Sequence, residues 1–267
     1  MKVIIDNKIP YIQGALEPFA EVIYLPGKDT TAEIAKDADA IITRTRTKCN
    51  EELLAGSTVK MIATATIGYD HIDTKWCEAN GIEWKNAPGC NSWSVVQYIM
   101  AGLHTLALEK KMKLEGMTIG IIGAGNVGSK VAKYCQLIGM NVLVNDPPRQ
   151  RAEGNDGFVS LDEIQEKAEI ITIHTPLTYE GADKTFHLID EKFIDSCSQD
   201  FFLINAARGE VTDTHAVLTA LKFGKIREAI IDCWEKEPEI DLELLEHTFI
   251  STPHIAGYSR DGKANGT

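Results

Sequence analysis

The feature that most constrains the fold of this chain is a regular alternation of short β-branched runs with stretches of helical pattern. Several of the runs are almost continuously apolar, which is typical of parallel strands buried on both faces of a sheet. Strands that alternate with helices predict βαβ units, so we expect an α/β protein. The 267 residues are enough for one large or two medium domains with a sizeable core.

The expected strands fall into two series along the chain. The first series is Val3–Asp6, Glu21–Leu25, Ala40–Thr43, Met61–Thr64 and Ile82–Lys85, and the second is Thr118–Ile122, Asn141–Asn145, Ile170–His174, Phe201–Asn205, Glu228–Asp232 and Thr248–Ser251. Between the two series, Ser92–Lys113 lacks proline and has apolar residues at helical spacing, which predicts one long connecting helix. We therefore expect two domains, at residues 1–92 and 93–257.

Charge and cysteine content argue against several classes of function. The chain has 27 basic and 39 acidic side chains, a net charge of −12, which argues against nucleic acid or an anionic membrane as the main partner. No apolar run approaches the length of a membrane span. The six scattered cysteines form no C-x-x-C pair and no Cys/His cluster. This spacing predicts no metal site, and reduced, mostly buried thiols in a cytoplasmic protein.

A glycine-rich turn follows the first strand of the second series. Thr118–Ile122 runs into Gly123-Ala-Gly-Asn-Val-Gly128, and a helical pattern continues from Ser129. Gly123 permits a tight turn, Gly125 lets the backbone approach a pyrophosphate, and Gly128 allows close packing of helix on strand. The helix N-terminus offers free N–H groups to phosphates. A turn that merely connects strand and helix is the alternative, but the context favours a dinucleotide site.

The preferred cofactor is indicated by Asp146, which follows the next strand at the expected interval. A carboxylate there can accept hydrogen bonds from both ribose hydroxyls and would repel a 2′-phosphate, so NAD is favoured over NADP. Arg149 follows closely and could tolerate NADP, which leaves that alternative open.

Three polar residues of the second half follow predicted strands, namely Arg208, Glu237 and His254. Ligands of open α/β sheets bind beyond the carboxyl ends of strands, so we expect these side chains to converge beside the glycine turn. His254 can act as a base near neutral pH, Glu237 can raise its pKa, and Arg208 can hold a substrate carboxylate. Each residue alone has an ordinary structural interpretation, but their joint placement favours an NAD-dependent dehydrogenase.

These motifs resemble the D-2-hydroxyacid dehydrogenase family over nearly the whole chain. The resemblance rests on Ala65–His71, Gly123–Gly128, Asp146–Arg149, His174–Leu177, Asn205–Gly209, Asp232–Pro238 and Pro253–Gly257. It implies a flavodoxin-like substrate-binding domain, a Rossmann-type NAD-binding domain, and a catalytic triad of Arg208, Glu237 and His254. It also implies NAD contacts at Gly123, Gly125, Asn126, Val127, Gly128, Asp146, Thr175, Ala206, Ala207, Arg208, Asp232 and Gly257.

The same resemblance implies a substrate site and an assembly. Substrate contacts would fall at Thr45, Thr66 and Tyr258. Further matching stretches resemble a branch of the family that acts on a small anionic phosphorylated 2-hydroxy acid. Residues 258–267 would begin the segment that returns to the substrate domain, without the C-terminal helix and dimerisation domain of relatives. The full-length form would be a homodimer.

A compact basic run, Thr43-Arg-Thr-Arg-Thr-Lys48, follows a strand of the first series. It carries three cations and three hydroxyls on an otherwise acidic chain, which favours a local anion site. We expect Arg44, Thr45 and Arg46 to help hold the phosphate or the carboxylate of the substrate. An ordinary solvated basic loop is the alternative on spacing alone.

The expected function is NAD-dependent oxidation of the C2 hydroxyl of a phosphorylated 2-hydroxy acid to a 2-oxo acid. The nearest alternative is another D-2-hydroxyacid dehydrogenase, such as one that acts on D-3-phosphoglycerate. A second alternative is an NAD-sensing interaction protein of the same fold, in which the cofactor controls assembly rather than turnover.

Overall fold

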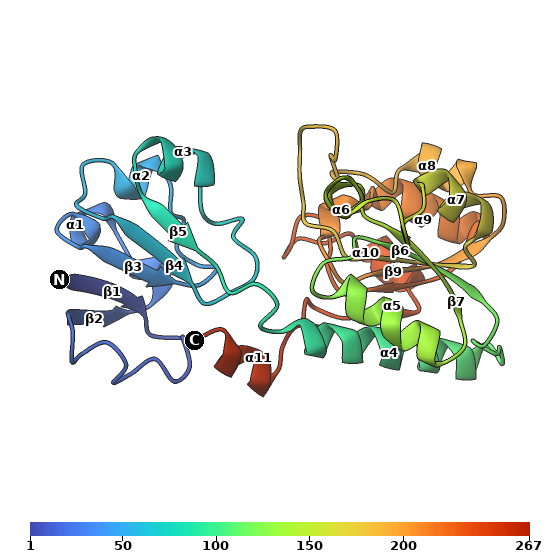
Figure 1. Ribbon diagram of the computed structural model, residues 1–267, viewed down its shortest axis with the longest axis horizontal. Coiled ribbons are helices and arrows are strands. Elements are labelled where there is room, and N and C mark those ends of the chain that lie inside the picture. The colour runs from blue at the N-terminus through green and yellow to red at the C-terminus, as the bar shows by residue number, and fades with distance from the viewer. The chain divides into compact units, whose positions relative to one another are not determined.

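The computed structural model describes residues 1–267, and the chain divides into two compact units. One unit is Met1–Ser92 together with Tyr258–Thr267, and the other is Trp93–Gly257. Each unit contains one parallel β-sheet with helices, so the expected α/β class is confirmed (Figure 1).

The sheet of the first unit has the strand order β2-β1-β3-β4-β5, with every pair parallel. This is the flavodoxin-like order that the resemblance implied. The strands are β1 (Lys2–Asp6), β2 (Glu21–Leu25), β3 (Ala40–Thr43), β4 (Met61–Thr64) and β5 (Glu83–Lys85). The helices are the short 3₁₀ helix η1 (Gly27–Asp29), α1 (Ala32–Ala35), α2 (Glu51–Leu54), α3 (Thr74–Ala79) and α11 (Arg260–Asn265).

The core of the first unit lies on both faces of its sheet. On one face, strand residues such as Ile41 and Ile62 pack against Leu54 of α2 and Cys77 of α3. On the other face, Val3 and Ile5 of β1 form a second, smaller cluster with Ile9 and Ile12 of the segment between β1 and β2.

The sheet of the second unit has the order β11-β10-β9-β8-β6-β7, again entirely parallel. The strands are β6 (Thr118–Ile122), β7 (Asn141–Asn145), β8 (Ile170–Ile173), β9 (Phe201–Asn205), β10 (Ile226–Ile231) and β11 (Ile250–Ser251). The strand order changes direction between β6 and β8, which is the point where doubly wound α/β sheets bind ligands. The expected Rossmann-type architecture is confirmed.

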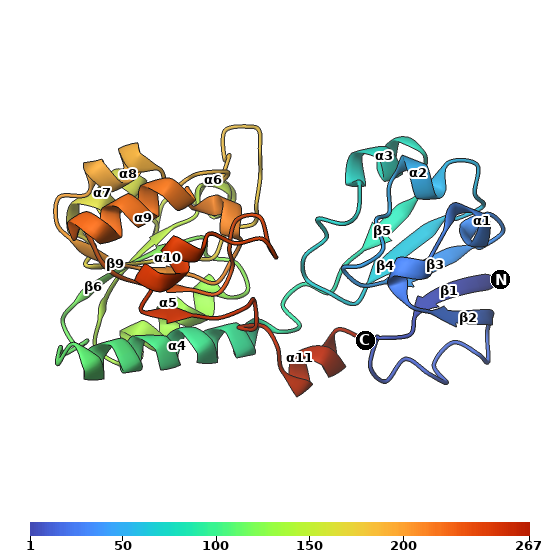
Figure 2. The ribbon, with the colours of Figure 1, turned by 180° about the vertical axis from the view of Figure 1, so that it is seen from behind.

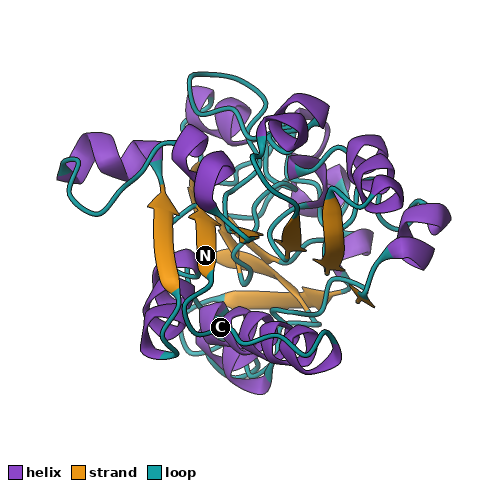
Figure 3. Cartoon of the chain, turned by 90° about the vertical axis from the view of Figure 1, so that its right-hand side faces the viewer, coloured by secondary structure: helices purple, strands orange, loops and turns teal.

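Helices cover both faces of this second sheet, as Figures 1 and 2 show, and Figure 3 looks onto the strands between them. Helices α4 and α5 pack on one face around Leu103 and Val131, and α7, α8, α9 and α10 pack on the other around Ile164 and Val217. The bounds are α4 (Ser92–Glu109), α5 (Gly128–Leu137), α6 (Pro147–Glu153), α7 (Leu161–Lys167), α8 (Glu191–Ser196), η2 (Gly209–Val211), α9 (Thr214–Phe223) and α10 (Leu242–His247).

The long helix α4 ends four residues before the expected Lys113. Lys111 adopts a left-handed conformation with φ of +52°, and the N–H groups of Lys111 and Met112 donate to the carbonyls of Leu108 and Ala107. This pattern is a Schellman motif, which terminates a helix through backbone geometry that apolar spacing does not reveal. None of the helices is both long and apolar enough to cross a membrane.

Candidate active site

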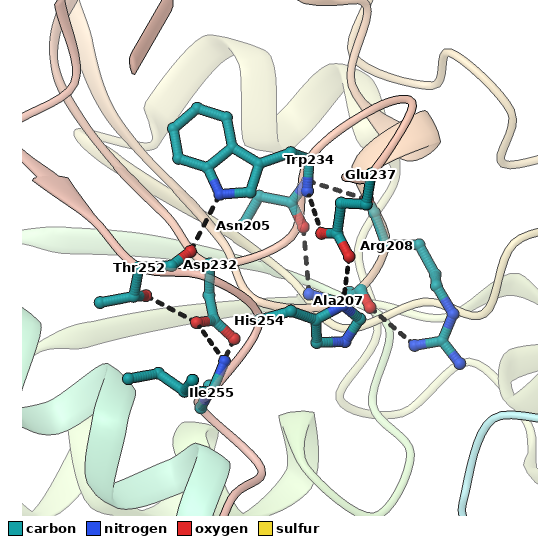
Figure 4. Close-up of polar contacts among 10 residues, drawn as sticks. Asn205, Ala207, Arg208, Asp232, Trp234, Glu237, Thr252, His254 and Ile255 are labelled. Carbon is teal, nitrogen blue, oxygen red and sulfur yellow. Dashed lines mark hydrogen bonds and ion pairs between the residues drawn. The ribbon is translucent and has the colours of Figure 1, made fainter. Parts of the chain in front are cut away.

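The polar residues expected in the active site follow strands of the second sheet. The glycine turn follows β6, Arg208 follows β9, Glu237 follows β10 and His254 follows β11. These carboxyl ends lie at one edge because the strands are parallel. Figure 4 shows Arg208, Glu237 and His254 gathered beside one another at this edge.

His254 and Glu237 form a hydrogen-bonded pair. Nδ1 of His254 lies 2.9 Å from Oε2 of Glu237, whose Oε1 accepts the backbone N–H of Trp234 at 2.7 Å. The hydrogen bond to Glu237 raises the pKa of His254, against the opposing effect of burial. Burial alone would raise the pKa of Glu237, but the hydrogen bonds from His254 and Trp234 lower it. Nε2 of His254 has no partner, and the side chain is 48% exposed, so this nitrogen is available to exchange a proton.

A buried carboxylate holds the loop that carries His254. Oδ1 of Asp232 accepts the hydroxyl of Thr252 at 2.6 Å and the N–H of Ile255 at 2.8 Å, and Oδ2 accepts the N–H of Ala256 at 2.8 Å. His254 has a left-handed φ of +54°, an uncommon backbone conformation for a residue other than glycine. Asp232 therefore supports the His254 loop, and its expected contact with NAD stays a prediction.

A second network positions Arg208. The side-chain amide of Asn205 donates to the carbonyl of Arg208 at 2.9 Å, and Oδ1 of Asn205 accepts the N–H of Ala207 at 3.1 Å. The adjoining Gly209 packs on the backbone of Trp234 so closely that a Cβ would lie 2.0 Å from the Trp234 carbonyl carbon. Glycine is required at this contact, which brings the loop after β9 against the loop after β10.

The supporting roles of Asn205, Gly209 and Asp232 were not expected from the sequence. An asparagine or aspartate directly at the end of a buried strand is the signal that could have indicated Asn205 and Asp232, because a polar side chain there must find nearby donors or acceptors. The requirement for Gly209 depends on a contact with a distant loop, so no local pattern predicts it.

The glycine turn has the geometry that its sequence predicts. Gly123 has a φ of +91°, and a Cβ there would lie 2.8 Å from the carbonyl carbon of His174. A Cβ on Gly128 would lie 1.9 Å from the carbonyl oxygen of Gly123, so the first turn of α5 can pack here only with glycine. A Cβ on the exposed Gly125 would meet no atom within 4 Å, which leaves open space where a phosphate group would approach.

Asp146 lies beside this turn, and Arg149 is engaged elsewhere. Oδ2 of Asp146 accepts the N–H of Ala124 at 2.8 Å, and its Oδ1 accepts the N–H of Arg149 at the start of α6. The guanidinium of Arg149 pairs with both carboxylate oxygens of Glu153 at 2.7 Å and donates to the carbonyl of Ala124. A 2′-phosphate would have to compete with Glu153 for Arg149 and would meet the charge of Asp146, so the site fits NAD better than NADP.

Two buried polar atoms beside the glycine turn have no partner in the chain, namely Oγ1 of Thr175 and Nδ1 of His174. Burial lowers the pKa of His174 to about 3, so its ring is neutral. A buried polar atom without a hydrogen bond costs about 1–3 kcal/mol, and such atoms are rare. The unpaired hydroxyl of Thr175 therefore suits a polar ligand, and the residues around the turn fit a dinucleotide.

The other residues expected to contact NAD lie on the loops of the same sheet edge. Asn126 and Val127 belong to the glycine turn, Ala206 and Ala207 follow β9, and Gly257 ends the second unit. Asn126 is exposed and the other four are half-buried, so none of them is buried in the core. Their contacts with NAD stay predictions.

Apart from Arg208, the residues expected to bind substrate belong to the first unit. Thr45 and Arg46 are exposed in the loop after β3, and NH1 of the half-buried Arg44 donates to the carbonyl of Lys8 at 3.2 Å. The exposed Tyr258 has the ammonium of Lys263 4.0 Å from its ring centre. These residues are exposed or partly exposed, as contact with a ligand requires.

Two hydroxyls of the basic run serve the fold instead. The hydroxyl of Thr43 donates to the carbonyl of Arg44 at 3.0 Å, and that of Thr47 donates to the carbonyl of Gly27 at 2.9 Å. Both side chains are buried, which leaves Thr45 as the one hydroxyl of the run that faces solvent.

Thr66 is part of a hydrogen-bond chain at the carboxyl end of β4. Its hydroxyl lies 2.7 Å from that of Thr64 and donates to the carbonyl of Gly68, and Nε2 of His71 lies 3.1 Å from the Thr64 hydroxyl. Burial lowers the pKa of His71, which favours the neutral ring. The partner of His71 is thus a threonine at the end of the preceding strand.

Comparison with known proteins places these features in a family. Residues 97–256 match the family model for the NAD binding domain of D-isomer specific 2-hydroxyacid dehydrogenases. The chain is 59% identical to an erythronate-4-phosphate dehydrogenase of Bacteroides thetaiotaomicron and 58% identical to one of Bacteroides fragilis, each match covering 100% of this chain and 77% of the relative.

A solved structure is similar over the whole chain as well. A D-lactate dehydrogenase of Aquifex aeolicus, crystallised with NAD and lactic acid, aligns with a TM-score of 0.83 and 29% identity, covering 100% of this chain and 92% of that one. The two parallel α/β sheets agree with this structural match. The chain belongs to the D-isomer-specific 2-hydroxyacid dehydrogenase family and is an NAD-dependent enzyme.

Proposed function

We propose that the protein oxidises the C2 hydroxyl of 4-phospho-D-erythronate with NAD, giving the 2-oxo acid 4-phosphate for pyridoxal phosphate biosynthesis. The substrate is suggested by the names of relatives that are 58–59% identical over the whole chain. The structural observation that carries the reaction type is the His254–Glu237 pair, in which Nδ1 is held at 2.9 Å and Nε2 is left without a partner.

The residues of the pair and Arg208 divide the chemistry among them. NAD, when bound, supplies the acceptor for the hydride that leaves C2. Nε2 of His254 accepts the proton of the C2 hydroxyl at the same carbon. Glu237 stabilises the resulting imidazolium through Nδ1, and the guanidinium of Arg208 binds the substrate carboxylate by charge-assisted hydrogen bonds. The products are the 2-oxo acid, the reduced cofactor and a proton on His254.

The phosphate of the substrate is assigned to the loop after β3. Arg44, Thr45 and Arg46 combine two guanidinium groups with one exposed hydroxyl in a chain whose net charge is −12. Planar guanidinium groups match the oxygens of phosphate, and a local cationic cluster is needed to hold an anion on an acidic protein.

A substrate panel tests this assignment. We expect NADH formation, followed by absorbance, to be fastest with 4-phospho-D-erythronate among phosphorylated and plain 2-hydroxy acids. Substitution of both Arg44 and Arg46 by alanine should raise KM for the phosphorylated substrate at least tenfold and change KM for an unphosphorylated analogue little. Lys48→Ala, which removes an exposed cation of the same run, is the matched control.

Other outcomes of the panel separate the alternatives. A clear preference for D-3-phosphoglycerate would assign the chain to another dehydrogenase of the family. NAD binding without turnover on any 2-hydroxy acid would favour an NAD-sensing protein. Equal changes in KM for phosphorylated and plain substrates in the double variant would remove the arginines from the phosphate site.

Assembly and location complete the proposal. We infer that the protein is a homodimer with a cytoplasmic location. The homodimer is suggested by the family resemblance, and the location by six cysteines that are all unpaired. Light scattering of the purified protein measures its molecular mass and so tests whether it is a dimer.

A further inference from the structure

A third side chain lies against the histidine–glutamate pair. Sγ of Cys233 and one potential ligand atom each from Glu237 and His254 all lie within 4.8 Å of one another. Cys233 follows β10 and His254 follows β11, so the group is assembled by two loops. For this reason the spacing of cysteines along the chain did not indicate it.

The group is closed on one side and open on the other. Cys233 is 2% exposed, whereas the side chains of His254 and Glu237 are 48% and 33% exposed. A small ion can therefore reach the imidazole and the carboxylate from solvent, and the sulfur lies within 4.8 Å of the potential ligand atoms of both. Thiolate, imidazole and carboxylate are the three ligand types of zinc sites, and three protein ligands leave a fourth position for water.

We propose that Cys233, Glu237 and His254 form an inhibitory site for a thiophilic divalent cation, with Zn²⁺ and Cd²⁺ as the representative ligands. A thiolate and an imidazole favour such cations over Mg²⁺ and Ca²⁺, which prefer oxygen ligands. Burial raises the pKa of the Cys233 thiol well above its ordinary value, so the cation must displace the proton of the thiol to solvent.

Inhibition follows from the ring nitrogen of His254 to which the cation would bind. Bound through Nδ1 of His254, it replaces the proton shared with Glu237 and leaves the ring proton on Nε2, which can then no longer accept a proton. Bound through Nε2, it occupies the base directly. The inhibitory effect thus rests on the proposed role of His254, whereas the binding of the cation does not.

Direct binding is the first measurement. Untagged protein is titrated with Cd²⁺, and the thiolate-to-metal charge-transfer absorbance is followed with Cys233→Ala, Cys233→Ser and Cys135→Ala as comparison variants. Cys135 is a fully buried cysteine of the same unit outside this group, so its variant is the matched control. We expect one equivalent of Cd²⁺ to give the band in the wild type and the control, and both Cys233 variants to lose it.

Inhibition is the second measurement, expressed relative to the activity of each protein without cation. Zn²⁺ should inhibit the wild type and Cys135→Ala, a chelator should reverse this, and Mg²⁺ should have no effect. The Cys233 variants lose a metal ligand, so Zn²⁺ should inhibit them about 100-fold more weakly or less still. Removing only a hydrogen-bond partner of a metal ligand already lowers metal affinity by up to about 100-fold.

The two measurements distinguish the ways in which the proposal can fail. Equal Cd²⁺ stoichiometry and absorbance in the wild type and both Cys233 variants would overturn the site, whatever the protein catalyses. Normal binding in a protein that turns over no 2-hydroxy acid would leave the site standing and refute the proposed function. Binding at Cys233 without inhibition of an active enzyme would overturn the inhibitory role.

Discussion

The loop after β10 carries two glutamates that each hold a histidine. Glu237 binds His254 at 2.9 Å, and Glu235, two residues earlier, binds His187 at 2.7 Å. The two histidines also share a left-handed backbone, with φ values of +54° and +51°. Neither a carboxylate partner nor an uncommon backbone conformation therefore distinguishes one pair from the other.

The polar atoms of His187 and Glu235 interact with other residues of the second unit. Nε2 of His187 contacts Glu235, and its Nδ1 lies 3.4 Å from Oδ2 of Asp213. The second oxygen of Glu235 accepts the N–H of Thr214 at the start of α9, and the His187 ring stacks on Phe186 with centroids 4.0 Å apart. The pair therefore joins three segments of the second unit and has no nitrogen left for a ligand.

The His254 pair differs in having one nitrogen free. The side chain of His254 is 48% exposed, compared with 30% for His187, and Glu237 is 33% exposed, compared with 15% for Glu235. The comparison teaches that an unshared nitrogen open to solvent, rather than the presence of a carboxylate, separates a candidate base from a structural histidine.

The largest expected effect separates the two histidines by activity. His254→Ala should lower kcat by about 10²–10⁴-fold, the usual contribution of a general base, while NAD binding is retained. His187→Ala should change kcat less than tenfold but lower the unfolding temperature, because hydrogen bonds to charged groups contribute about 1.5–3 kcal/mol. Steady-state kinetics and thermal unfolding of both variants check this, and equal losses of kcat would erase the distinction.

A smaller effect separates the two glutamates by pH dependence. Because Glu237 raises the pKa of His254, the neutral base of the wild type forms only above a pH higher than that of an ordinary histidine. Glu237→Gln removes this effect, so the acidic limb of kcat/KM for oxidation should move to lower pH. Glu235→Gln is the matched control and should leave the limb in place. A limb that moves upward, or moves equally in both variants, contradicts the assignment.

Much of the fold follows from local sequence because buried parallel strands carry a strong apolar signal. The strand at Phe201–Asn205 was predicted with the bounds that β9 has. Ends of elements were less predictable: β10 begins at Ile226 rather than Glu228 and ends before Asp232, whose carboxylate holds a neighbouring loop. Such ends depend on pairing and on hydrogen bonds between distant segments.

The candidate site divides in the same way. The glycine turn and the residues Arg208, Glu237 and His254 were recognisable from motifs after strands. The surroundings of these residues were not recognisable. The proximity of Cys233 to His254 and the hydrogen bond between His187 and Glu235 arise only when separate loops meet. Chemistry-bearing residues can thus be predicted from the chain, whereas the groups that support or interfere with them require the fold.

The central claim is that the free nitrogen of His254 removes the substrate proton, and rescue of a variant by free imidazole tests it most directly. NADH formation from 4-phospho-D-erythronate is measured in His254→Ala and in His187→Ala with increasing imidazole at constant pH. The account predicts a slow His254→Ala variant whose rate rises with imidazole, and a His187→Ala variant that does not respond. A His254→Ala variant that turns over at the wild-type rate without imidazole would contradict the account.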